Sequence, residues 1–126
     1  MKFLCIVFVD EARLHALSPR ESQALDDVSL AYDETLRERG HLLAAQALES
    51  VNTAAVVRVR DGRVLVTDGP FAEAREQVGG FILIEARDRG EAIEVAARIP
   101  AIQLGGIEVR PVKELVASSS LHEKPQ

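Results

Sequence analysis

The chain has 126 residues and a formal net charge of −5, with 47% hydrophobic and 28% charged residues. This length and composition fit one globular domain with a buried core, and they exclude a wholly disordered chain and an integral membrane protein. Acidic and basic residues are interleaved, and no Lys/Arg cluster offers a basic face to phosphates. We therefore expect no nucleic-acid partner.

Residues 2–9 predict a buried β-strand, because apolar side chains occupy both of its alternating faces. The run resembles the apolar part of a signal peptide, but Asp10 and Glu11 follow at once and no small-residue cleavage site appears. Cys5, in this strand, is the single cysteine of the chain. No disulfide framework is therefore present, and we expect a cytoplasmic protein that does not associate with a membrane.

Two helices are predicted from their capping signals. Residues 18–21, which read Ser-Pro-Arg-Glu, can form a capping box with proline in the first turn, and this helix should end near Gly40. Asp88 opens a second helix in the same way, and Pro100 ends it. The predicted apolar stripes are Leu25, Val28, Tyr32 and Leu36 on the first helix and Ile93, Ala96 and Ala97 on the second.

Five further strands are predicted, over residues 41–48, 53–60, 63–67, 81–84 and 106–112. Asp61-Gly62 joins the second and third of these as a two-residue hairpin turn. Such a turn pairs Val59 with Val64 and Val57 with Val66 on one face, opposite a face that carries Arg58, Arg60, Arg63 and Leu65. We expect this hairpin to be half-buried, with its register fixed by the turn.

The predicted order is β-α-β, a hairpin, and β-α-β. It indicates an α+β fold of the split βαβ, ferredoxin-like type with an inserted β-hairpin. Two helices cover only one face of such a sheet, yet residues 2–9 and 81–84 are apolar on both faces. We therefore expect a homodimer in which a second copy covers the other face; the alternative is that the hairpin folds back over it. The domain should span residues 1–113, followed by a disordered tail over 114–126.

A long turn segment carries a family resemblance. Residues 67–81 read Thr-Asp-Gly-Pro-Phe-Ala-Glu-Ala-Arg-Glu-Gln-Val-Gly-Gly-Phe, which closely resembles the signature of the DGPFAETKE family, a branch of the YCII-related proteins. The lead-in over 53–67 and the landmarks at 97–100 and 109–112 extend the resemblance to about residues 1–113. It implies a dimeric α+β barrel. Many such proteins are encoded beside extracytoplasmic-function sigma factors, which implies a regulatory or stress-related role.

The resemblance also bears on catalysis. Related YCII proteins include dehydrochlorinase-like enzymes, for which a His–Asp pair has been proposed as the active site. The histidine of that pair lies on the first helix, at the position that Ser29 occupies here. Many DGPFAETKE proteins carry another histidine after the second helix, where this chain has Gln103 and Leu104. Both departures weaken the enzyme hypothesis.

Asp68 is the candidate for chemistry. A carboxylate at a strand end, before Gly69 and Pro70, can project into a cleft as a general base. Alternatively, it accepts backbone N–H groups within its own turn. Phe71 is expected to anchor a core or an interface, with a substrate platform as the alternative.

Arg75, Tyr32 and His41 are candidate ligand-binding residues, together with Phe71. Arg75 lies in a polar loop that leads into Gly79-Gly80; it can clamp an anionic ligand, or the loop is a solvated charged segment that pairs internally. Tyr32 points its hydroxyl between helix and sheet, or it is a core residue with a satisfied hydroxyl. The three histidines of the chain have no metal-ligand spacing, so we expect no metal site, and no motif indicates a cofactor.

Three classes of function follow. The favoured one is a dimeric module, with a regulatory or stress-related role, that binds a small ligand or a partner. The second is a cofactor-independent enzyme, lyase- or hydrolase-like, that acts on a small organic substrate with Asp68 as general base and Arg75 or His41 assisting. The third is an interaction protein without a ligand. A pocket lined by Asp68, Arg75 and Tyr32 would support the first two.

Overall fold

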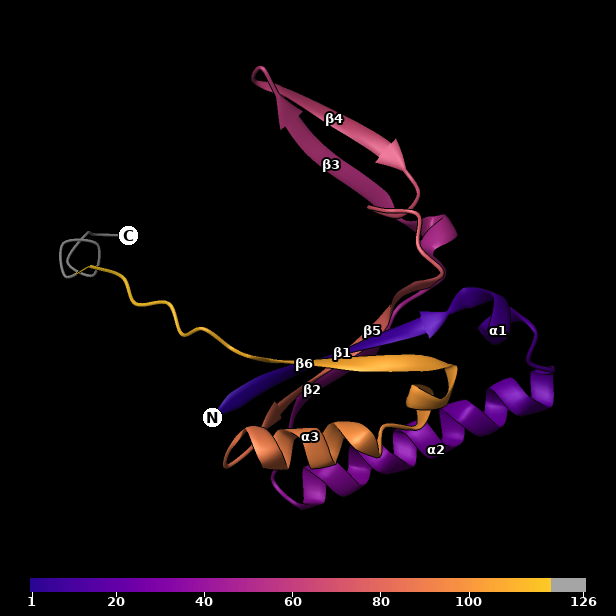
Figure 1. Ribbon diagram of the computed structural model, residues 1–126, viewed down its shortest axis with the longest axis vertical. Coiled ribbons are helices and arrows are strands. Elements are labelled where there is room, and N and C mark those ends of the chain that lie inside the picture. The colour runs from indigo at the N-terminus through magenta and orange to yellow at the C-terminus, as the bar shows by residue number, and fades with distance from the viewer. Residues whose placement is uncertain (119–126) are drawn as a thin grey trace.

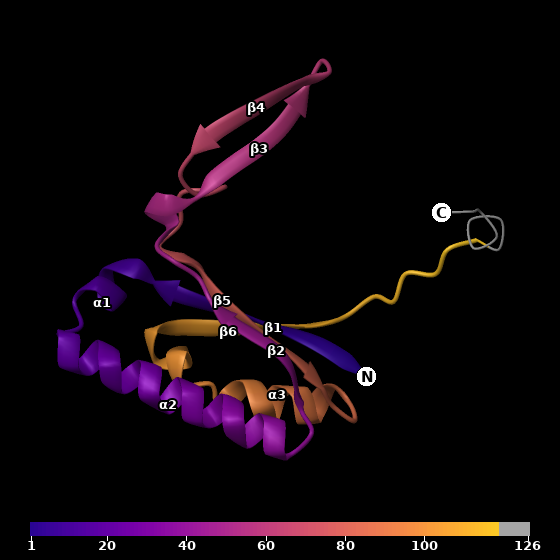
Figure 2. The same ribbon diagram turned by 180° about the vertical axis from the view of Figure 1, so that it is seen from behind.

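The computed structural model describes residues 1–118, which form one four-stranded sheet, one two-stranded hairpin and three α-helices. The sheet is antiparallel and has the strand order β2-β5-β1-β6. Helices α2 and α3 lie side by side against one face of this sheet, and the hairpin projects away from its other side (Figures 1 and 2). The sheet strands are β1 (Lys2–Asp10), β2 (Leu42–Ala47), β5 (Glu76–Glu85) and β6 (Gly105–Pro111), and the hairpin strands are β3 (Ala55–Arg60) and β4 (Arg63–Asp68).

The helices begin where their capping residues predict. In α2 (Pro19–Glu38), the Ser18 hydroxyl accepts the Glu21 N–H at 3.1 Å, and the Glu21 carboxylate accepts the Ser18 N–H at 2.9 Å. The helix ends just before Gly40, whose φ of +77° suits glycine. Asp88 caps α3 (Arg89–Ala97). The remaining helical segments are α1 (Glu11–His15) and the 3₁₀ turns η1 (Val51–Thr53) and η2 (Pro100–Leu104).

The core lies between the helices and the sheet. Alternate β1 residues Phe3, Cys5 and Val7 are buried there, against Leu36 of α2 and Ile84 of β5. The side chains between them point to the opposite face, which we call the open face: Leu4, Ile6 and Phe8 of β1 with Phe81 and Leu83 of β5. These five are only partly buried and do not belong to the core cluster. One chain therefore covers one face of its sheet and does not close a barrel.

Four details of the helices and strands differ from the sequence prediction. On α2, the predicted stripe residue Val28 is 52% exposed, whereas Leu25 and Tyr32 pack against the core and Leu36 is buried. Helix α3 buries Ala92, Val95 and Ala96, whereas Ile93 is 42% exposed, because the helix turns its small residues to the sheet for close packing. Helix α1 was not predicted; the Asp10 carboxylate caps it by accepting the N–H groups of Ala12 and Arg13. Strand β5 begins at Glu76 rather than at residue 81, so the paired glycines lie inside it.

The hairpin, residues 55–68, is called the arm below. Its turn and register are as predicted: Asp61 and Gly62 both have positive φ, Val59 faces Val64, and Val57 faces Val66. The prediction of a half-buried hairpin is wrong for the single chain, because the arm points away from the sheet (Figure 1). All four of these valines are 63–69% exposed. The arm therefore does not fold back over the open face.

The end of the described chain is extended. Residues 114–118 form neither helix nor strand, and residues 119–126 of the predicted tail lie outside the described part. Within residues 1–118, no helix is both long enough and apolar enough to cross a membrane.

Candidate functional site

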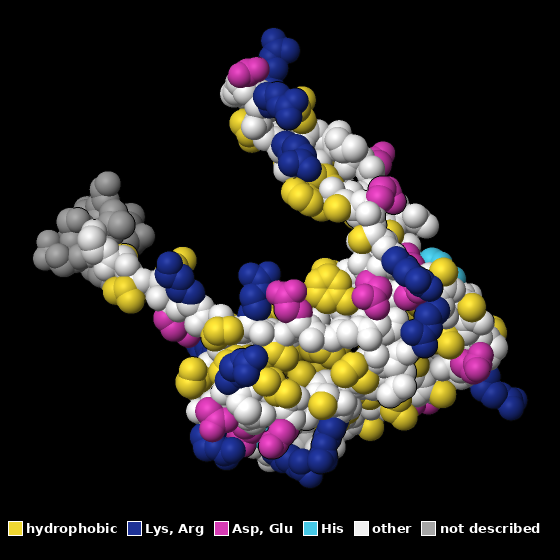
Figure 3. Space-filling view, in the orientation of Figure 1, with side chains coloured by type: hydrophobic (Ala, Val, Ile, Leu, Met, Phe, Trp, Pro, Cys, Tyr) yellow, Lys and Arg dark blue, Asp and Glu magenta, His cyan; other side chains and the backbone are white. Residues whose placement is uncertain are grey.

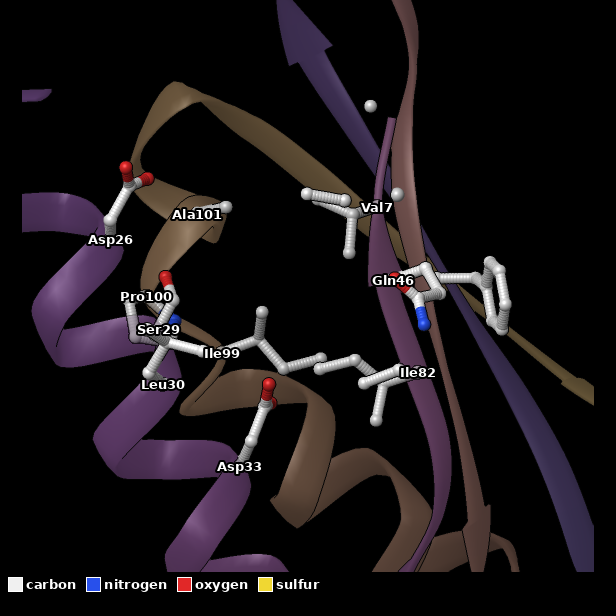
Figure 4. Close-up of a pocket in the computed structure, with 15 residues that line it drawn as sticks. Val7, Asp26, Ser29, Leu30, Asp33, Gln46, Ile82, Ile99, Pro100 and Ala101 are labelled. Carbon is white, nitrogen blue, oxygen red and sulfur yellow. The ribbon is translucent and has the colours of Figure 1, made fainter. Parts of the chain in front are cut away.

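A cleft of about 460 Å³ lies between helix α2 and the β2 edge of the sheet (Figure 4). This volume is within the usual range for small-molecule sites. Most of its wall is apolar, with η2 closing one end. The lining residues are Val7, Asp26, Ser29, Leu30, Asp33, Ala45, Gln46, Ala47, Gly79, Gly80, Phe81, Ile82, Ile99, Pro100 and Ala101.

The polar groups of the cleft come mainly from α2. Asp26, Ser29 and Asp33 are three and four residues apart, which places them on one side of the helix over two turns. In Figure 4 the three side chains extend from α2 at the border of the space between helix and strands, with Asp26 near η2, and Gln46 lies across this space on the strand side. Within residues 1–118, neither carboxylate makes a hydrogen bond or an ion pair. The helix therefore presents two unpaired negative groups and one hydroxyl to an apolar hollow.

Burial raises the pKa of Asp33, and the charge of Arg37 acts in the opposite direction. Arg37 itself is paired with Glu34. No Lys, Arg or His lines the cleft, so no cation of its wall compensates the two carboxylates and no histidine can activate Ser29. The arrangement suits binding of a positive charge better than nucleophilic catalysis.

The opposite wall depends on Gly80 of β5. A Cβ at this position would lie 2.8 Å from the backbone oxygen of Gln46, which is too close for any side chain. Glycine therefore allows β2 to pair closely with β5 and leaves this wall of the cleft free of a side chain.

Asp68 and Phe71 lie at the base of the arm and do not line the cleft. Asp68 is the last residue of β4; it is exposed, and no hydrogen bond or ion pair within residues 1–118 holds its carboxylate. Gly69 follows with a φ of +104° and donates its N–H to Ala54 O at 2.8 Å, which closes the arm at its base. Phe71 is 74% exposed, and the Arg58 guanidinium lies 4.5 Å from its ring centre.

Arg75 is used within the chain. Its Nε donates to Asp10 Oδ2 at 3.1 Å, although the arginine side chain is otherwise exposed. Burial alone would raise the pKa of Asp10, but the hydrogen bonds from Arg75 and from the N–H groups of Arg13 and Ala12 hold it below its ordinary value. The loop before Arg75 is fixed by Gln77, whose Nε2 donates to Ala72 O and Ala74 O.

Tyr32 and His41 lie together at a smaller hollow of 210 Å³, on another side of α2. The Tyr32 hydroxyl donates to Val95 O at 2.7 Å, and burial raises the pKa of this hydroxyl. His41 Nδ1 lies 2.8 Å from Glu85 O. Both side chains thus have structural partners. The structure brings these two candidates together, but separates them from Asp68, Arg75 and Phe71.

Sequence reasoning missed Asp26 and Asp33. The available signal was a polar series at helical spacing beside the apolar stripe of α2, with Ser29 in its centre. Gln103 and Leu104 line a neighbouring hollow of about 470 Å³. Burial raises the pKa of Cys5 to about 11, which favours the protonated thiol at neutral pH. In the described part of the chain, no three His, Cys, Asp or Glu residues are grouped to hold a metal.

Comparison with known proteins agrees with the resemblance to the YCII-related proteins. The model of the YCII-related domain matches residues 1–116. An uncharacterised protein of Rhizobium meliloti (strain 1021) is 32% identical over 114 residues, which cover 89% of this chain and 92% of that protein. The chain belongs to the YCII-related family.

Proposed function

We propose that this protein binds a small organic molecule with an apolar body and a positively charged amine in the cleft between α2 and the sheet. The observation that carries the proposal is the pairing of an apolar hollow of about 460 Å³ with two unpaired carboxylates, Asp26 and Asp33. The apolar walls, among them Ile82 and Ile99, would take the body of the ligand. The carboxylates would take its charge.

The negative charge of the cleft favours a cationic ligand over an anionic one. Burial of Asp33 is unfavourable for its charged form, as its raised pKa indicates, and the charge of Arg37 offsets this cost only in part. A ligand ammonium would offset this cost, whereas a ligand carboxylate would add repulsion. Binding should lower the pKa of Asp33, and affinity should decrease as the pH falls through that pKa.

The proposal includes a homodimer. The open face of the sheet is apolar at its centre. A second copy related by a two-fold axis would bury this face. The order β2-β5-β1-β6, with α2 and α3 on one face, supports the split βαβ, ferredoxin-like class, and two such sheets would form the dimeric α+β barrel. Ligand binding would serve a regulatory or stress-related role, in a reducing cytoplasm that suits the buried free thiol of Cys5.

A thermal-shift series tests the ligand class. Benzylamine, benzyl alcohol and benzoate share one ring and differ in charge, so their effects on the melting temperature report the sign that the cleft prefers. We expect benzylamine to raise the melting temperature most and benzoate least. Asp33→Asn should remove the advantage of the amine. Asp27→Asn is the matched control, since Asp27 lies on α2, pairs with Gln23 and does not line the cleft.

Equal shifts with benzoate and benzylamine would contradict the charge preference. An amine effect that survives in Asp33→Asn would contradict the assignment to this cleft.

A further inference from the structure

The arm carries an apolar face that nothing in the described chain covers. Val57, Val59, Val64 and Val66 form two directly opposed cross-strand pairs on one face of the hairpin, and each is about two-thirds exposed. An isolated two-stranded hairpin is marginally stable in water, and it becomes stable when its apolar face packs against another layer. The arm therefore needs a partner surface to be an ordered element.

The direction of the arm is fixed at its base. Gly69 adopts a φ of +104°, and its N–H donates to Ala54 O at 2.8 Å, so the two ends of the hairpin are joined. On the face opposite the valines, the Arg58 guanidinium stacks on the Phe71 ring. The residues of the segment from Asp68 to Phe71 thus build the root of the arm.

The arm and the open face of the sheet border the same hollow. Both lie on the side of the molecule away from α2 and α3 (Figures 1 and 2). Figure 3 shows hydrophobic side chains beside Lys and Arg on the arm, and hydrophobic side chains between charged ones on the surface of the body that faces this hollow. The valine face of the arm and the apolar centre of the open face therefore both lack a cover within residues 1–118.

We propose that a second copy of this chain fills the hollow and that each copy packs the valine face of its arm against the other. This inference rests on the dimer proposed above and adds the arm to its interface. In a dimer with a two-fold axis, each copy brings the same two apolar surfaces, the valine face of the arm and the open face of the sheet. Each surface can then be covered by the other copy, whereas an unrelated partner would not bring these surfaces. Strands of six residues span about 20 Å, whereas two packed sheets lie about 10 Å apart. The arm is therefore long enough to extend beyond the open face and to contact the second copy.

The test compares two neighbouring residues of β4 in the full chain. Val66→Gln alters the valine face, and Leu65→Gln makes the same change to a neutral amide on the face of Arg58. The dimer dissociation constant is measured by light scattering over a dilution series. We expect Val66→Gln to raise it about tenfold or more and Leu65→Gln to raise it less than about threefold. Circular dichroism and melting curves verify that both variants fold.

Hydrogen exchange gives a second readout on the wild-type chain. Amides of β3 and β4 should exchange slowly at concentrations where the dimer forms and rapidly after dilution to the monomer. Slow exchange of the arm in the diluted monomer would overturn the inference, because the arm would then be stable without a partner.

Ile6→Gln, on the open face, separates this inference from the dimer itself. If Ile6→Gln dissociates the dimer while Val66→Gln leaves it as tight as the wild type, the dimer stands and the role of the arm is overturned. Equal weakening by Val66→Gln and Leu65→Gln also overturns the assignment to the valine face. A wild-type chain that stays monomeric overturns both proposals.

Discussion

In the sheet, the inward residues of β1 have almost no exposure, with Phe3 at 1% and Cys5 at 0%, whereas the valines of the arm keep about two-thirds of theirs. Both regions follow the same two-residue alternation. The difference lies in what stands opposite: α2 and α3 cover the inner face of the sheet, and no element of residues 1–118 covers the arm. Alternation of side chains along a strand indicates that its apolar face is to be buried. It does not show whether the layer that covers this face belongs to the same chain.

The largest expected effect is in the core of the sheet. Phe3→Ala should lower the free energy of unfolding by about 3–5 kcal/mol, because it leaves a cavity among buried side chains. Val57→Ala in the arm should cost the monomer less than about 1 kcal/mol, since its side chain is already exposed. Urea unfolding at a concentration where the chain is monomeric measures both. Similar losses of unfolding free energy in the two variants would contradict the difference in burial between the sheet and the arm.

The next effect concerns the wall of the cleft. Gly80→Ala places a methyl group against the Gln46 backbone oxygen, so β2 must shift, at a cost of about 1–3 kcal/mol. Gly106→Ala is the matched control, because a Cβ there meets nothing within 4 Å. Urea unfolding of the two variants gives the difference in stability. A Gly80→Ala protein as stable as the control would show that β2 has more freedom than its pairing with β5 implies.

A smaller effect on stability is expected from Asp10, at the junction of β1 and α1, when the pH is lowered. The pKa of Asp10 is lowered in the folded state, so its charge contributes stability above the unfolded pKa. That contribution is lost as the pH falls through the lower, folded pKa. Asp10→Asn should therefore be less stable than the wild type at neutral pH, and the gap should close on acidification. Melting temperatures between pH 7 and about pH 2 follow the gap; a constant gap would contradict the role of the carboxylate charge.

The smallest effect is expected at the end of the arm. Asp68→Asn should change the melting temperature by no more than about 1–2 °C, because nothing within residues 1–118 holds this carboxylate. Gly69→Ala should cost more, since alanine disfavours a φ of +104°. Differential scanning calorimetry compares the two. A large loss with Asp68→Asn would mean that the carboxylate has a partner outside the described chain, such as a second copy.

Local signals predicted much of the fold. The capping box of Ser18 and Glu21, the turn at Asp61-Gly62 and the two-sided apolar pattern of residues 2–9 each have a short-range physical cause. The exposure of the arm was not predictable, because the angle at which the hairpin leaves the sheet depends on long-range packing. Helix α1 was missed because five residues carry too little periodicity.

The candidate site was less accessible to sequence reasoning. Asp68 drew attention through its motif, but it lies at the root of the arm. Asp26 and Asp33 look like ordinary solvated helix residues until the packing of α2 beside β2 creates a hollow next to them. Only the position of Ser29, indicated by the family resemblance, pointed to this part of the helix.

Binding of a positively charged small molecule in the cleft can be followed residue by residue, by titrating benzylamine into isotope-labelled protein and recording the backbone amide resonances. We expect shifts that cluster at Ser29, Asp33, Ala47, Gly80 and Ala101, saturate with ligand and disappear in Asp33→Asn. Shifts that are absent, that cluster around Asp68 and Arg75, or that benzoate reproduces would contradict this binding.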